Sequence, residues 1–72
     1  MTRNEHLEWC KRRALEYVDA GDVDQAMASM LSDLGKHPEL ENHIGKQLMF
    51  AERMSGRLTM PHEMRKFIEG FN

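Results

Sequence analysis

Four glycines divide the 72 residues into segments of helical length, and this spacing limits the chain to a small all-α fold. Gly21, Gly35, Gly56 and Gly70 each follow a stretch in which apolar residues recur every three or four positions. Glycine readily takes the left-handed conformation that ends a helix. The spacing therefore predicts four short helices in two stacked antiparallel hairpins, over residues 4–35 and 39–70 of one domain that spans residues 1–72.

The first hairpin has the clearest pattern. A helix over residues 4–20 and a second over residues 23–34 each present one continuous apolar stripe. Asp22 is expected to cap the second helix, with Gln25 reaching back as in a capping box. The residues expected in the shared core are Leu7, Cys10, Ala14, Tyr17, Val18, Val23, Ala26, Met27, Met30, Leu31 and Leu34.

The second hairpin is expected to begin after Pro38, because proline disfavours helical geometry in the residue before it. Its first helix, over residues 39–55, would bury the stripe formed by Leu40, Ile44, Leu48, Ala51 and Met54. Its second helix is expected to have Thr59 as its cap and Pro61 in its first turn. That helix would bury Met60, Met64, Phe67, Ile68 and Phe71.

Composition narrows the classes of function. The net charge is −2, so no global basic field attracts nucleic acid or an anionic membrane. No apolar segment resembles a signal peptide or a membrane span, and a single cysteine excludes an intramolecular disulfide. We therefore expect a cytoplasmic protein with a thin core, for which a homodimer would be one source of added stability.

The first hairpin resembles a tetratricopeptide repeat. Ala14, Tyr17, Ala26, Met30 and Pro38 fall at the relative spacing of that repeat, and the segment GDVDQA resembles its turn. The chain departs from the repeat at two positions, with Arg13 where an apolar residue is usual and Cys10 where an aromatic one is usual. The resemblance implies two closely packed antiparallel helices, and a second, divergent hairpin stacked on them.

Most of the chain also resembles a family of small proteins encoded by tailed bacteriophages. The segments that carry this resemblance are EHLEWCKRRALEYVD, SDLGKHPE and MRKFIEGFN. The family implies no known reaction. It implies a protein that acts in the cytoplasm of an infected bacterium and binds or inhibits a host protein, including components of antiviral defence.

Histidine and cysteine offer one candidate metal site. His6 and Cys10 are four residues apart on a predicted helix, and the antiparallel hairpins would bring His37 and His43 to the same end. These four side chains could hold zinc, or they could be a buried thiol and solvated loop histidines. Both interpretations stay open at this point, and a zinc-stabilised structural or nucleic-acid-binding protein is the alternative function.

Catalysis is not indicated, because no glycine-rich elbow or phosphate loop positions Cys10 or any serine as a nucleophile. The sequence favours a non-enzymatic module that binds another protein. Aromatic residues, methionine and arginine are enriched at the centres of interfaces. We therefore expect the partner to contact Trp9, Met49, Phe50 and Arg53, with Tyr17 more consistent with the core.

Overall fold

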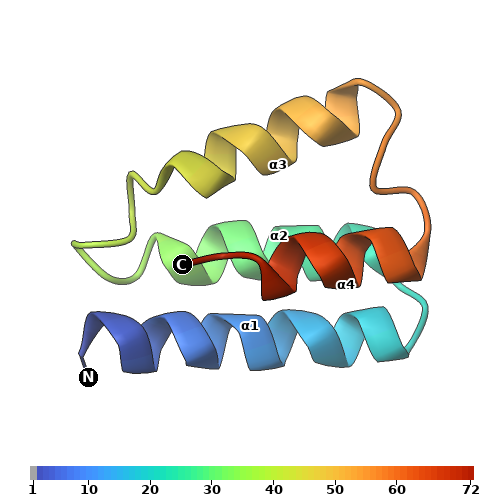
Figure 1. Cartoon of the computed structure of the whole chain (residues 1–72). Helices are drawn as coiled ribbons and strands as arrows, with labels where there is room; N and C mark the ends of the chain where they lie inside the picture. The colour runs from blue at the N-terminus through green and yellow to red at the C-terminus, as the bar shows by residue number, and fades with distance from the viewer. Residues whose placement is uncertain (1) are drawn as a thin grey trace.

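The computed structural model describes residues 2–72, and within this range the secondary structure consists of four helices (Figure 1). They are α1 (Arg3–Asp19), α2 (Val23–Leu34), α3 (Ile44–Met54) and α4 (Pro61–Glu69). α1 and α2 form an antiparallel hairpin, and α4 packs against both. The all-α prediction is confirmed. The arrangement is compatible with two antiparallel hairpins, of which the second is open, since α3 has no comparable packing with any other helix.

Side-chain caps fix the starts of the first two helices. The Thr2 hydroxyl accepts a hydrogen bond from the Glu5 N–H, and the Glu5 carboxylate accepts one from the Thr2 N–H, which makes a capping box at α1. At α2, the Asp22 carboxylate accepts from the Gln25 N–H, as the sequence predicts. Both caps satisfy amide groups that have no partner inside the helix.

The predicted left-handed glycines are confirmed at two of the four helix ends. Gly21 has a φ angle of +79° and Gly56 has +84°. After each, the next residue's N–H bonds back across the last turn, as in a Schellman motif. Gly35 and Gly70 have φ angles of −67° and −80°, so the prediction is wrong there. The chain leaves these helices in further right-handed turns and needs no reversal.

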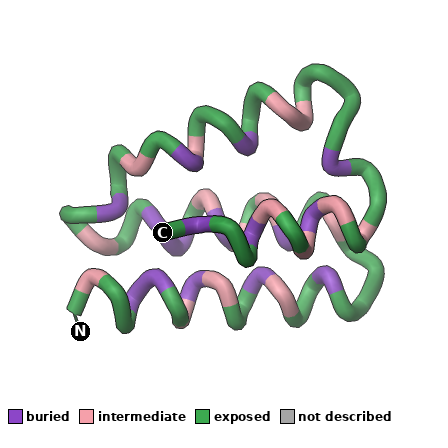
Figure 2. Tube along the Cα trace, viewed as in Figure 1, coloured by how far each residue is buried: buried purple, intermediate pink, exposed green. Residues whose placement is uncertain are grey.

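The core lies mainly between α1, α2 and α4 (Figure 2). Cys10, Ala14 and Ala26 are fully buried at the α1–α2 contact, where their small size lets the two helices approach closely. Met30 and Leu34 of α2 are fully buried as well, as predicted. Tyr17 was expected in the core, but its side chain is 37% exposed.

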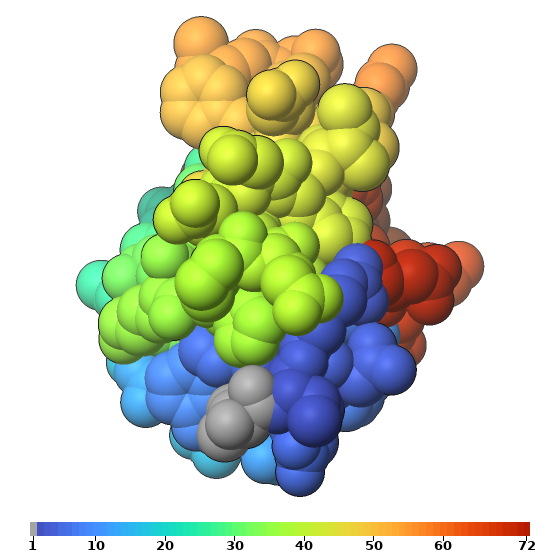
Figure 3. All heavy atoms as spheres, turned by 90° about the vertical axis from the view of Figure 1, so that its left-hand side faces the viewer, coloured from blue at the N-terminus to red at the C-terminus, as the bar shows by residue number. Residues whose placement is uncertain are grey.

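The third helix is shorter than predicted, and the side of it that is buried is not the predicted one. Residues 39–43 form turns, so α3 begins at Ile44. Of the stripe that was expected to be buried, Leu40 is buried but the four residues on α3 face solvent: Ile44 is 63% exposed, Leu48 53% and Met54 74%, and Ala51 is exposed too. Gly45 and Met49 are buried instead. In the space-filling view, the yellow and orange atoms of α3 project beyond the rest of the molecule (Figure 3).

The N-cap of the fourth helix lies one residue later than predicted. Met60, not Thr59, is the N-cap residue, because the Glu63 carboxylate accepts the hydrogen bond of the Met60 N–H. Pro61 occupies the first turn, as predicted. Of the residues expected to be buried here, Met64, Ile68 and Phe71 are in the core, Phe67 is partly buried, and Met60 is exposed.

Residues outside the helices complete the core. Leu40 precedes α3, Leu58 precedes α4, and Phe71 follows α4, and all three are buried. Leu58 has a φ angle of +58°, a conformation that costs a leucine roughly 1–2 kcal/mol. Burial of its side chain offsets this cost. The loops on both sides of α3 therefore hold it to the molecule as much as its own side chains do.

Candidate interaction groove between α3 and α4

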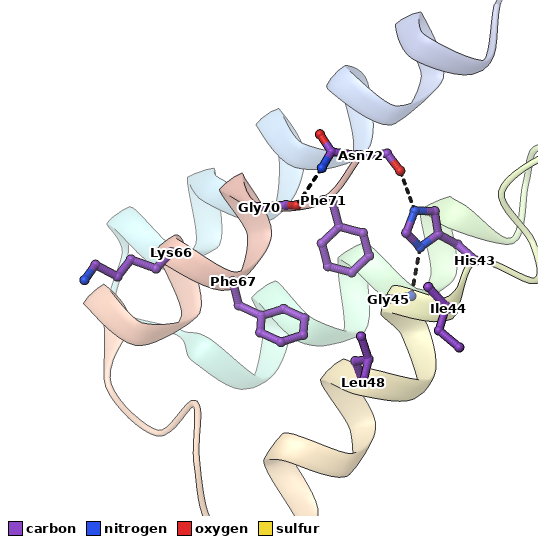
Figure 4. Close-up of a pocket in the computed structure, with 9 residues that line it drawn as sticks. All are labelled: His43, Ile44, Gly45, Leu48, Lys66, Phe67, Gly70, Phe71 and Asn72. Atoms are coloured by element: carbon purple, nitrogen blue, oxygen red, sulfur yellow. Dashed lines mark hydrogen bonds between the residues drawn. The ribbon is translucent and has the colours of Figure 1, made fainter.

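An apolar groove of about 570 Å³ separates the start of α3 from the end of α4 (Figure 4). Its volume is within the range of binding pockets. The side chains of Phe67 and Phe71 point from the α4 side toward α3, and the Lys66 side chain points away from the groove. The residues that line it are His43, Ile44, Gly45, Leu48, Lys66, Phe67, Gly70, Phe71 and Asn72.

The tail after α4 forms one wall because it is tied to two helices. His43 Nδ1 accepts a hydrogen bond from the Gly45 N–H at 2.8 Å, so Nε2 carries the proton and donates to the main-chain oxygen of Asn72 at 2.6 Å. Arg3 Nη2 donates to the same oxygen at 2.9 Å. The starts of α1 and α3 and the tail are thereby held together at one end of the groove.

Gly45 allows the tail to approach α3 closely. The ring of Phe71 stacks beside His43 and meets Phe67 edge-on, with ring centroids 5.2 and 5.7 Å apart. A Cβ atom on Gly45 would lie 2.4 Å from Cε2 of Phe71 and 2.9 Å from Nδ1 of His43. The floor of the groove therefore depends on the absence of a side chain at this position.

Replacement of Gly45 by alanine is expected to push the Phe71 ring into the groove and to break the His43 cap. We expect a loss of about 1–2 kcal/mol in the free energy of unfolding, measured by urea denaturation. Gly70→Ala is the matched control, because its nearest new contacts are ordinary ones of 3.4 and 3.5 Å. Equal stability of Gly45→Ala and the wild type would contradict this account of the groove floor.

The four residues predicted to contact a partner do not form one patch. Met49 is fully buried in the core, so it offers no surface. Trp9 is partly buried beside α2, and Arg53 forms an ion pair with Asp24 of α2. Phe50 is the member that lies exposed on α3.

Trp9 belongs to a polar cluster around the buried carboxylate of Asp33. This carboxylate accepts hydrogen bonds from Arg13 Nε at 2.7 Å and Lys36 Nζ at 3.1 Å, and from the Ser29 hydroxyl at 3.3 Å. Arg13 and Lys36 also lie over the Trp9 ring, at 4.9 and 5.6 Å from its centroid. The cluster joins α1 to the end of α2 through this one carboxylate.

The four candidate zinc ligands are only partly brought together. His6 and His37 are adjacent, with ring centroids 5.2 Å apart, as the antiparallel hairpin predicts. His6 Nε2 bonds to the main-chain oxygen of Asp33, and both nitrogens of His43 are occupied as described above. In residues 2–72, no three His, Cys, Asp or Glu side chains form a group that could hold a metal ion. Zinc binding stays a prediction without a ligand cluster.

Cys10 is a buried thiol, and burial raises its pKa from 9.0 to about 11, with the Asp33 carboxylate acting in the same direction. At pH 8, a thiol reagent is expected to modify the folded protein far more slowly than the urea-unfolded protein. Because the folded pKa is the higher one, the stability that the neutral thiol contributes is complete below pH 9 and is lost as the pH rises toward 11.

Urea denaturation at a series of pH values measures this loss, and Cys10→Ala should remove the part of the alkaline slope due to the thiol. Similar rates of modification in the folded and unfolded states would show that Cys10 is accessible and would contradict its burial.

Comparison with protein-family models, with curated proteins and with solved structures finds no match to this chain. The groove therefore has to be interpreted from its own residues. The sequence interpretation placed Phe67 and Phe71 in the core and did not single out Gly45. A glycine inside a predicted helix is a local signal of a close approach, but Phe67 and Phe71 are distant in the chain, so the sequence does not identify them as its neighbours.

Proposed function

We propose that this chain is a non-enzymatic protein-interaction module that holds an apolar segment of a partner protein in the groove between α3 and α4. The observation that carries this proposal is the open groove itself, whose walls are Ile44, Leu48, Phe67 and Phe71. These four side chains are apolar, and the charged lining residue Lys66 points its side chain away from the groove. Exposed apolar surface with a concave shape favours a protein ligand over a polar metabolite.

The resemblance to small proteins of tailed bacteriophages supports a narrower form of the proposal. In that form the partner is a protein of the host bacterium, and binding inhibits it; a component of antiviral defence is one such target. The non-enzymatic role is supported by the chemistry around the groove. The imidazole of His43 has both nitrogens in structural hydrogen bonds, and Cys10 is enclosed in the core.

The alternative of nucleic-acid binding has less support because most basic side chains are paired. A nucleic-acid surface needs cations free to neutralise phosphates. In the part of the chain that the structure describes, six of the ten basic residues form ion pairs with carboxylates. These six are Lys11, Arg13, Lys36, Arg53, Arg57 and Arg65.

The proposal is tested by affinity capture with a matched pair of variants. Phe67→Ala removes a wall of the groove, and Phe50→Ala removes an exposed phenylalanine that does not line it. Proteins captured from bacterial lysate are identified by mass spectrometry, and binding is then measured by calorimetry with the purified partner. Circular dichroism checks that both variants are folded.

Phe67→Ala is expected to weaken binding at least about tenfold, as for loss of a central aromatic contact, whereas Phe50→Ala keeps it. Equal binding by Phe67→Ala and the wild type, or no partner above background, would overturn the groove as the binding site.

A further inference from the structure

The exposed side of α3 is an apolar surface without a charged residue. We call it the α3 outer face and define it by Ile44, Gln47, Leu48, Phe50, Ala51 and Met54, all exposed. The charged residues of this helix are Lys46, Glu52 and Arg53, and each is engaged in hydrogen bonds or ion pairs. The apolar side of an amphipathic helix is normally the buried one. In α3 that side is left open.

We propose that the α3 outer face is the interface of a homodimer, in which α3 of one copy packs against α3 of a second copy. In a dimer with two-fold symmetry, a surface patch meets the same patch on the other copy. A charged residue at its centre would therefore face its own like charge. The α3 outer face contains no such charge, and its small Ala51 side chain permits close approach of two helices.

The area is sufficient for a weak dimer. Ile44, Leu48, Phe50 and Met54 are each more than half exposed. With roughly 200 Å² for a fully exposed side chain of this size, covering them buries about 500 Å² on each copy. The pair then buries about 1,000 Å², which is the lower limit for a specific interface. The dimer is accordingly expected to dissociate on dilution.

The small size of the domain also favours a dimer, because a short chain buries little apolar surface on its own. A domain of this length buries only about 60% of the surface of its unfolded chain, and oligomerisation is a common remedy. α3 contributes only Gly45 and Met49 to the core. α3 therefore buries little of its surface within the monomer. A second copy would cover the α3 outer face and add to this burial.

Sedimentation equilibrium of the full chain over a concentration series tests the proposal. The wild type is expected to shift from 8.4 kDa toward about 17 kDa as concentration rises. Met54→Glu places two carboxylates in the interface and should raise the dissociation constant at least about 100-fold. Met60→Glu is the matched control, since Met60 is also exposed but lies outside α3, and it should dimerise normally.

Three outcomes would overturn the homodimer. The first is a wild-type monomer at every concentration, and the second is a dimer that Met54→Glu leaves intact. The third is a monomer whose partner capture is lost in Met54→Glu, which would assign the α3 outer face to a different protein. Ile44 and Leu48 belong to both the groove and the α3 outer face, whereas Phe67 lines the groove alone. Phe67→Ala is therefore expected to dimerise normally whether or not it binds a partner.

Discussion

Replacement of Met30 by alanine is expected to lower the free energy of unfolding by about 2–5 kcal/mol. Met30 is fully buried on α2, where α1 and α4 both pack. The substitution removes three heavy atoms from the core and leaves a cavity that rigid neighbours cannot fill. Because a domain of this size has a total stability on the order of 5 kcal/mol, a large fraction of the variant would be unfolded at 37 °C.

Urea denaturation followed by circular dichroism measures this loss, and Met54→Ala provides the control with the same chemical change. Met54 is 74% exposed, so its truncation should alter the stability of the monomer by no more than about 0.5 kcal/mol. The comparison is made at a concentration where the wild type is monomeric. Equal effects of the two substitutions would mean that α2 and α3 are not packed as described.

Replacement of Asp33 by alanine is expected to cost about 2–3 kcal/mol. The carboxylate is almost fully buried and joins Arg13, Lys36 and Ser29. Its removal leaves these donors without their common acceptor and opens a space between α1 and α2. The loss is smaller than for a fully enclosed ion pair because both cations are about half exposed and regain water.

Asp24→Ala is the control for this prediction, since Asp24 also pairs with an arginine but is 75% exposed. A surface pair of this kind contributes about 0–1 kcal/mol, so the control should remain close to the wild type. Urea denaturation of the two variants gives the comparison. If Asp33→Ala were as stable as Asp24→Ala, the Asp33 cluster would have no structural role.

The first hairpin could be predicted from the sequence because each of its helices is apolar on one side only. Met30 and Ala26 recur at helical spacing and face α1, and the cap at Asp22 is a local property of the chain. Such features depend on residues within one turn or on one contact between neighbouring helices. They do not depend on how the rest of the chain folds.

The orientation of α3 could not be predicted in the same way. Periodicity identified the apolar stripe through Ile44, Leu48 and Met54, but the rule that an apolar stripe is buried assumes enough partner surface to cover it. In this chain α4 packs on α1 and α2, while Met49, Leu40 and Leu58 take the available places in the core. Competition between distant segments for contact with the core determines which side of α3 is buried. A local sequence pattern cannot predict the outcome of that competition.

The candidate groove could not be predicted from the sequence for a related reason. Its walls come from Phe67 and Phe71 on one side and Leu48 on the other, which are separated in the chain and meet only after folding. The tail that closes it is held by Arg3 and His43 through the Asn72 main chain. A main-chain acceptor has no signature in the sequence.

The position of Trp9 allows unfolding of the α1–α2 hairpin to be followed separately from unfolding of α3. It is the chain's single tryptophan, and the cations of Arg13 and Lys36 both lie over its ring beside the α1–α2 contact. Its fluorescence therefore reports on that hairpin and is insensitive to α3, whose helical content circular dichroism still records. If α3 melts before the rest of the chain, the two signals will give different transition curves, and the protein will not be two-state even at 72 residues.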